Sequence, residues 1–106
     1  MTTRPTDDPV LRRYRAALDE MYGDKIERVV LFGSRARGDA RADSDFDIAV
    51  FLKSLPDRWA ELDRLADLRV RFFDDDAFFD AKPYPATAWS ERTPLMREIR
   101  RDGLQL

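Results

Sequence analysis

The chain has 106 residues, a length that suits one domain spanning residues 1–106 and built around one core. Charged residues make up 38% of the chain, yet the net charge is only -2, which argues against a dedicated nucleic-acid binder. Cysteine and histidine are both absent, which excludes disulfides, thiolate catalysis, zinc sites and an imidazole base. Acid–base chemistry must therefore fall to carboxylates. Because no apolar run is long enough to span a membrane and no signal peptide is evident, the cytoplasm is expected.

The first third of the chain predicts a helix and then a buried strand. Residues 1–7 can be disordered, after which Asp8 caps a helix that has Pro9 at its first position. Apolar residues recur at helical spacing until Gly23 ends the run. Residues 26–32 are rich in β-branched and apolar types and end at a glycine, which is typical of a strand that leads into a phosphate-binding turn.

Residues 33–47 read GSRARGDARADSDFD and carry the chemistry. A short helix is expected from Ser34, followed by a loop and a second strand over residues 46–52. Side chains alternate along a strand, so Asp45 and Asp47 should leave the same face and lie on the opposite side from Phe46. Two carboxylates then point into one space at the end of a sheet.

A glycine-serine turn followed by two aspartates between strands is typical of nucleotidyl transfer. Charge explains why that reaction needs these residue types. Two carboxylates about 7 Å apart repel by roughly 2 kcal/mol at an effective dielectric near 20, so a cation such as Mg²⁺ is expected between Asp45 and Asp47. Two metal ions can stabilise the attacking and the leaving oxygens of a phosphoryl-type transfer. Gly33 permits close backbone approach to a phosphate, and Ser34 adds a hydroxyl and exposed amides. Arg35 and Arg37 could add cationic forks, or they could be surface guanidiniums.

The second half predicts two more helices and a third strand. Pro56 should open a long helix with one wide apolar face, made of a stripe and three apolar residues beside it: Leu55, Trp59, Leu62, Ala66, Val70 and Phe73 in the stripe, Leu65, Leu68 and Phe72 beside it. That face either covers a sheet or binds a partner in part. Residues 74–76 read as a solvated turn, and residues 77–82 as a strand containing Asp80, with Pro83 and Pro85 ending its pairing. Residues 94–102, between the cap Thr93 and Gly103, complete the chain as a helix.

A resemblance to a known family covers most of the chain, from the first helix to Gly103. The sequence resembles the minimal nucleotidyltransferases of the DNA polymerase beta superfamily, most of all the MNT antitoxins that are paired with HEPN toxins. The resemblance rests on Leu31-Phe32-Gly33-Ser34-Arg35-Ala36-Arg37-Gly38 followed by Asp45-Phe46-Asp47. It implies transfer of AMP from ATP, with Mg²⁺, to a tyrosine hydroxyl of a HEPN toxin encoded nearby.

The same resemblance implies a third carboxylate on the strand after the long helix. Asp80 is the position that matches by element, and it would join Asp45 and Asp47 as a metal ligand and catalytic residue. It would also take the proton from the attacking hydroxyl. A solvent-facing Asp80 without this role is the alternative.

The expected fold is α/β (α+β) in two or three layers. A small mixed sheet of three to four strands should carry helices mainly on one face and the carboxylates at an exposed end. Nucleotide binding is assigned to Gly33, Ser34, Arg35 and Arg37. Two functions compete with toxin adenylylation: an antitoxin that acts by complex formation without catalysis, and a small-molecule nucleotidyltransferase of the aminoglycoside-modifying kind. No membrane and no direct nucleic-acid partner is expected.

Overall fold

The computed structural model describes residues 5–106 and contains one four-stranded sheet in the order β3-β2-β1-β4. The strands are β1 (Ile26–Phe32), β2 (Phe46–Leu52), β3 (Phe79–Pro85) and β4 (Leu104–Gln105). β1 pairs antiparallel with both β2 and β4, whereas β2 and β3 run parallel. The expected small mixed sheet is therefore confirmed.

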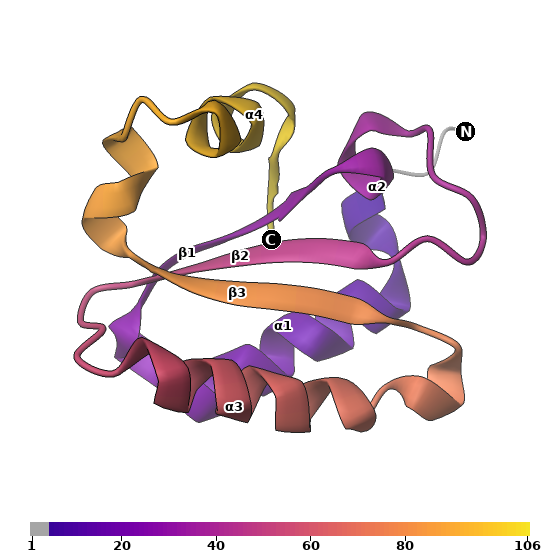
Figure 1. Ribbon diagram of the computed structural model, residues 1–106. Coiled ribbons are helices and arrows are strands. Elements are labelled where there is room, and N and C mark those ends of the chain that lie inside the picture. The colour runs from indigo at the N-terminus through magenta and orange to yellow at the C-terminus, as the bar shows by residue number, and fades with distance from the viewer. Residues whose placement is uncertain (1–4) are drawn as a thin grey trace.

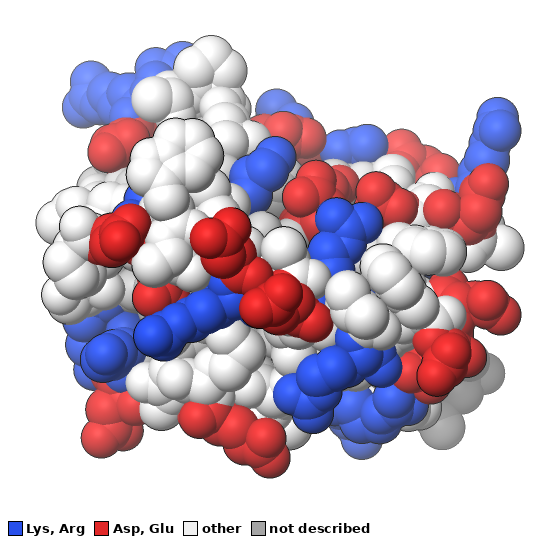
Figure 2. Space-filling view, turned by 60° about the horizontal axis from the view of Figure 1, so that its bottom comes forward, with Lys and Arg blue, Asp and Glu red and all other residues white. Residues whose placement is uncertain are grey.

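Helices cover both faces of the sheet, with the two long ones together on one face (Figure 1). These are α1 (Pro9–Tyr22) and α3 (Arg58–Val70), while α4 (Pro94–Asp102) and the 3-10 helix η4 (Ala86–Ser90) lie on the other face. The short α2 (Ser34–Arg37) follows β1 directly, and three further 3-10 turns are η1 (Pro5–Asp7), η2 (Gly23–Lys25) and η3 (Phe73–Asp75). Over the α1 and α3 face, acidic and basic side chains are interspersed (Figure 2).

Local capping chemistry determines where the helices begin. The Asp8 carboxylate accepts a hydrogen bond from the Val10 amide at 3.0 Å, and the Thr93 hydroxyl accepts one from the Met96 amide at 3.2 Å, as expected of caps. The long helix begins at Arg58 and not at Pro56, because the Asp57 carboxylate accepts from the Ala60 amide at 3.1 Å and serves as the cap. That start corrects the expected one by two residues.

Strand β2 separates two apolar clusters by the alternation of its side chains. Phe46, Ile48 and Val50 pack toward α1 and α3, and Ala49 and Phe51 pack toward α4 and η4. Asp47 has the parity of Ala49 and Phe51, so its side chain leaves the sheet on the face that carries α4.

The central aromatic group of the core joins α1 to β3. The rings of Tyr14 and Phe79 stack with centroids 3.9 Å apart, and the Phe72 ring meets both edge-on. The Tyr14 hydroxyl is buried without a hydrogen-bond partner among the described residues, and burial raises the pKa of Tyr14 far above its usual range.

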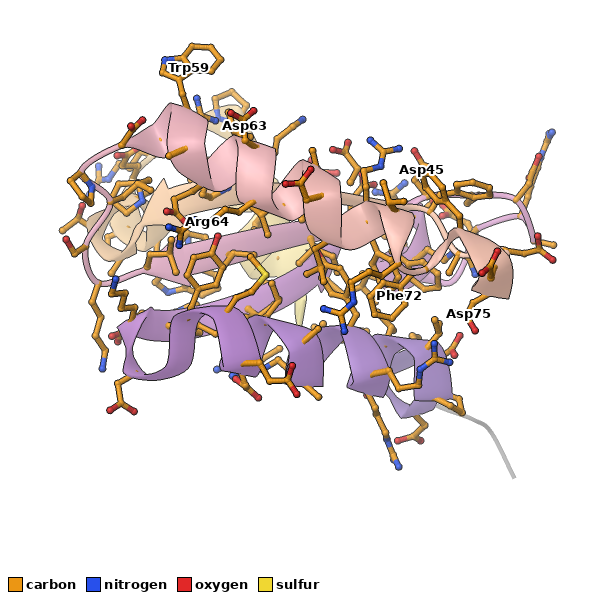
Figure 3. All side chains as sticks on the ribbon, turned by 90° about the horizontal axis from the view of Figure 1, so that it is seen from below. Asp45, Trp59, Asp63, Arg64, Phe72 and Asp75 are labelled. Atoms are coloured by element: carbon orange, nitrogen blue, oxygen red, sulfur yellow. The ribbon has the colours of Figure 1, made fainter. Side chains whose placement is uncertain are left out.

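Only part of the wide apolar face expected for α3 covers the sheet. Leu65, Leu68 and Phe72 are buried against the sheet, whereas Trp59, Val70 and Phe73 of the expected stripe are 77%, 59% and 41% exposed. Trp59 projects away from the body of the molecule at the N-terminal end of the helix (Figure 3). Two apolar arcs are alike in the sequence, and the arc that faces inward ends at Phe72, just after α3, whose ring meets those of Tyr14 and Phe79 edge-on.

The remaining differences lie at strand ends and termini. β3 pairs with β2 through Pro85, so neither Pro83 nor Pro85 ends the pairing, although β3 is an edge strand as the prolines suggested. β4 was not expected, since two residues leave no periodic pattern. Of the segment expected to be disordered, residues 1–4 lie outside the described residues, and Pro5–Asp7 form η1. Within residues 5–106, no helix is long and apolar enough to cross a membrane.

Candidate functional site

The turn after β1 brings backbone directly against a carboxylate. Gly33 has φ 73° and ψ -157°, a conformation that a side chain makes unfavourable. A Cβ built on Gly33 would overlap Oδ2 of Asp47 and lie 3.2 Å from its Cγ. Glycine is therefore required at this position both by its own backbone and by the approach of Asp47.

The turn continues into α2, whose first amides point away from the helix. The Gly33 carbonyl accepts from the Ala36 and Arg37 amides, both at 3.1 Å, and the Ser34 carbonyl accepts from the Gly38 amide at 3.0 Å. The amides at the start of a helix have no intrahelical acceptor, and within residues 5–106 those of Ser34 and Arg35 donate to no carbonyl in a turn or loop, so they can meet an external oxygen. Phosphate oxygens fit such amides.

Two arginines of the motif make contacts within the protein. Arg35 donates from Nε to the Ser44 carbonyl at 3.1 Å and from a terminal nitrogen to the Ala42 carbonyl at 3.0 Å. Its guanidinium also lies 4.2 Å from the centroid of the Phe46 ring. Arg37 pairs with Glu98 of α4 at 3.2 Å. The structure thus shows Arg35 holding the loop before β2, and Arg37 linking α2 to α4.

The parallel pairing of β2 and β3 places two predicted carboxylates side by side. Asp47 and Asp80 are direct register partners, and Asp45 is the exposed residue just before β2. Figure 3 shows Asp45 at the end of the molecule that also holds Asp75, opposite the end that holds Trp59. The structure therefore brings Asp47 and Asp80 together. Asp45 lies at the rim of the site, meaning the exposed position just before β2.

The pKa of Asp47 depends on burial and on the charges of the neighbouring carboxylates. Burial raises the pKa of the Asp47 carboxyl, and the negative charges of Asp80 and Asp45 raise it further, in that order. Lys82 acts in the opposite direction, and Glu98 adds a smaller raising effect. The ionised form of Asp47 is therefore unfavourable in the isolated chain, and a bound cation would stabilise it.

The donor set fits a magnesium ion that also binds phosphate. Within the described part of the chain, no group of three or more acidic side chains is close enough to enclose a metal ion. Mg²⁺ usually keeps several waters and binds through one or two carboxylates plus substrate phosphates. Asp47 and Asp80, adjacent and all-oxygen, fit that mode of binding, with Asp45 at the rim and the free amides after Gly33 nearby.

The segment that carries this site matches a known protein family. The family model described as nucleotidyltransferase domain matches residues 11–92, a stretch that contains the glycine turn and all three aspartates. The chain belongs to the nucleotidyltransferase domain family. The resemblance inferred from the motif is confirmed.

Curated relatives match a little under half of this nucleotidyltransferase domain. The "Putative protein adenylyltransferase MJ0141" of Methanocaldococcus jannaschii is 36% identical over 47 residues, covering 44% of this chain and 48% of that protein. A second protein of the same description and organism, MJ1215, is 40% identical over 48 residues, covering 45% of this chain and 54% of the relative. The aligned part of the chain thus spans about half the length of these relatives.

Solved structures extend the likeness to most of the nucleotidyltransferase domain. A crystal structure of a toxin-antitoxin with AMP-PNP aligns with TM-score 0.58 and 26% identity, covering 88% of this chain and 69% of that one. A mutant of the toxin-antitoxin MntA-HpeT aligns with TM-score 0.60 and 25% identity, covering 90% of this chain and 70% of that one. A nucleotidyltransferase structure from Sulfolobus solfataricus, at 16% identity and TM-score 0.55, shows the fold alone.

Two residues near the carboxylates escaped the sequence analysis. Lys82 lies two positions after Asp80 on the same face of β3, and its Nζ is 3.8 Å from Oδ2 of Asp80. The i, i+2 spacing on a strand could have identified it. Glu98 reaches the site from α4, and no sequence signal indicates where that helix lies on the sheet.

Proposed function

We propose that this nucleotidyltransferase domain transfers AMP from ATP to a hydroxyl of a partner toxin, and that the acceptor is a tyrosine of a HEPN toxin encoded nearby. The observation that carries the proposal is the Asp47 and Asp80 pair set against the backbone turn at Gly33. Toxin-antitoxin neighbours, one of them solved with AMP-PNP, support the donor and the kind of partner. We place this reaction in the cytoplasm.

In this proposal each part of the site has one task. The amides after Gly33 and the Ser34 hydroxyl hold phosphate oxygens of ATP. Asp47 and Asp80, with Asp45 at the rim, would hold Mg²⁺, as two ions. The metal supplies charge neutralisation at the phosphates when bound. Arg37, partly exposed at the edge of α2, can turn from Glu98 to a phosphate, whereas Arg35 acts through the loop it holds.

The transfer itself exchanges one phosphorus–oxygen bond for another. The acceptor oxygen forms a bond to the α-phosphorus of ATP, and the bond from that phosphorus to the oxygen bridging to the β-phosphorus breaks. Pyrophosphate leaves with that bonding pair. Asp80 takes the proton of the acceptor hydroxyl, because the chain has no histidine to do so and Asp80 lies beside Asp47 on the solvent-accessible edge of the sheet.

Mass spectrometry tests the proposal directly. The chain is incubated with Mg²⁺, ATP labelled at the α-phosphate, and the protein encoded by the adjacent reading frame. Mass of AMP on a tyrosine of that protein, absent with Asp47→Asn and retained with the helix-surface control Asp63→Asn, is the expected result. A stable complex that gains no mass would show an antitoxin that acts by binding alone, and label on small molecules would show a small-molecule transferase.

A further inference from the structure

Arg37 is the basic side chain of the glycine turn that is paired with another helix. Arg35 donates to two carbonyls of the loop before β2. Arg37 instead places Nη1 3.2 Å from Oε1 of Glu98 in α4, and its Nε lies 3.4 Å from Oδ2 of Asp39. Both of these partners are carboxylates, so the charge of Arg37 is already neutralised before any nucleotide binds.

The place of Arg37 in α2 brings its guanidinium within reach of the proposed phosphate site. α2 is four residues long, so Arg37 lies about 4.5 Å along the helix axis from Ser34. The Cα–Cβ bonds of a helix lean toward its N-terminus, which is the end where the amides of Ser34 and Arg35 can meet an external oxygen. The Arg37 side chain is 39% exposed, so packing leaves it room to rotate from one partner to another.

Glu98, by contrast, is fixed by the helix that carries it. α4 lies on the face of the sheet that carries the site (Figure 1). Its residues Met96 and Ile99 are 3% and 0% exposed in the apolar cluster on that face. The backbone of Glu98 therefore keeps its position when Arg37 turns away, and the carboxylate stays beside the site.

The charge of Glu98 also reaches the carboxylates of the site. The pKa of Asp47 is raised by burial and by the charges of Asp80 and Asp45, and Glu98 adds a smaller effect in the same direction. The pair of Arg37 and Glu98 thus lies in the electrostatic neighbourhood of the proposed metal and phosphate site.

We propose that Glu98 is a positioning residue that competes with the triphosphate of ATP for Arg37 and so weakens ATP binding by the free chain. The inference rests on the proposed function and concerns the regulation of its nucleotide site. Without nucleotide, Arg37 donates to Glu98. With ATP bound, Arg37 donates to a phosphate oxygen and the contact with Glu98 is lost. The free energy of that lost contact opposes ATP binding.

The ATP affinity of Glu98→Gln tests the sign of this effect. Glutamine keeps the shape of the side chain and removes its charge, so Arg37 is available to the phosphates from the start. The Kd for ATP with Mg²⁺, measured by calorimetry at low salt, should fall about two- to fivefold, the range expected for an exposed ion pair. Glu91→Gln is the matched control, because Glu91 is exposed just before α4 and the substitution removes the same charge. Equal or weaker ATP binding by Glu98→Gln would overturn the proposal, since Glu98 would then only brace α2.

A double-mutant cycle separates competition for Arg37 from direct repulsion between Glu98 and ATP. Under competition, Glu98→Gln tightens ATP binding only where Arg37 is present, so in an Arg37→Gln background the Kd should change by less than about 1.5-fold. Under direct repulsion, the gain would be larger in that background, because Arg37 would no longer neutralise Glu98. A gain in Arg37→Gln that equals or exceeds the gain in the wild-type background would overturn the proposal. Urea melts of each variant confirm that the domain is folded.

The affinity measurements need no catalysis, so this inference and the proposed function can fail separately. If the wild-type chain transfers no AMP to the adjacent-frame protein but the affinities follow the expected pattern, the proposed function fails and the competition for Arg37 stands. If transfer occurs and Glu98→Gln binds ATP no more tightly than wild type, the competition alone is refuted. If neither the wild-type chain nor Glu98→Gln binds ATP, both are refuted.

Discussion

Replacing Asp47 by asparagine should stabilise the metal-free chain while abolishing transfer. The pKa of Asp47 is raised from its ordinary value of 3.8, first by burial and then by the charges of Asp80 and Asp45. A group whose pKa rises on folding contributes stability that is present below its unfolded pKa and is lost as the pH rises through the folded pKa. Ionised Asp47 therefore weakens the native state at neutral pH, and the neutral amide of asparagine removes that effect.

The size of the effect follows from the spacing of the carboxylates and their exposure. Register partners such as Asp47 and Asp80 lie on strands about 5 Å apart, and two charges at that distance repel by roughly 3 kcal/mol at an effective dielectric near 20, which sets an upper limit. The Asp80 side chain is 45% exposed, so solvent screening reduces this toward the value for exposed pairs, below about 1 kcal/mol. We expect Asp47→Asn to raise the free energy of unfolding by about 0.5–1 kcal/mol at neutral pH.

Urea melts at two pH values measure this difference. At pH near 7.5 the variant should be the more stable protein, and toward pH 4 the difference should shrink as the wild-type carboxyl becomes protonated. Asp63→Asn, on the exposed surface of α3 (Figure 3), should not show this pattern. A variant that is less stable than wild type at neutral pH would refute the reasoning, because Asp47 would then make a stabilising contact. A gain that persists unchanged at pH 4 would show that charge is not its cause.

Three further substitutions test the packing around the site. Gly33→Ala should lower stability by at least about 1–2 kcal/mol and displace Asp47, with a loss of transfer. Gly38→Ala is the matched control, because Gly38 has φ 85° and nothing lies within 4 Å of an added Cβ. It should lower stability by a similar amount in denaturant melts and leave AMP transfer unchanged. If both variants lost transfer equally, the contact of Gly33 with Asp47 would not be the cause. Tyr14→Phe should raise the free energy of unfolding by about 1 kcal/mol, since the hydroxyl is buried and has no hydrogen-bond partner within residues 5–106; a loss of stability of similar size would show that the hydroxyl makes a stabilising contact. Arg35→Ala should destabilise the chain by about 1–3 kcal/mol with little direct effect on ATP affinity measured by calorimetry.

The parts of the fold that the sequence predicted are those set by local chemistry. Caps at Asp8 and Thr93 act within three residues, and the strand, glycine turn and second strand follow from composition over short windows. The contact of Asp47 with Gly33 was not predicted, because it depends on the antiparallel pairing of β2 with β1, the strand that ends just before Gly33. The pairing of Asp47 with Asp80 was implied by resemblance alone, since no local signal specifies the register between β2 and β3.

The parts that were missed depend on tertiary packing. α3 and the residues just after it carry two apolar arcs, and packing against Tyr14 and Phe79 selects the arc that ends at Phe72. Pro83 is compatible with a strand only because its nitrogen faces a free edge, and the sequence does not show which edge is free. Arg37 and Glu98, 61 residues apart in the chain, meet because α4 packs on the face that carries the site.

Packing on one face of β2 fixes the chemistry on the other. Phe46 and Ile48 are 4% and 0% exposed among α1 and α3, which directs Asp47 between them to the opposite face. A slip of one residue in the register would exchange the two faces, bringing Asp47 into the apolar cluster and Phe46 out of it. Burying an ionised carboxylate without a partner costs several kcal/mol, a large fraction of the stability of a small domain. The seven residues of β2 therefore contribute side chains to both apolar clusters and also keep Asp47 against the turn at Gly33, the proposed phosphate site.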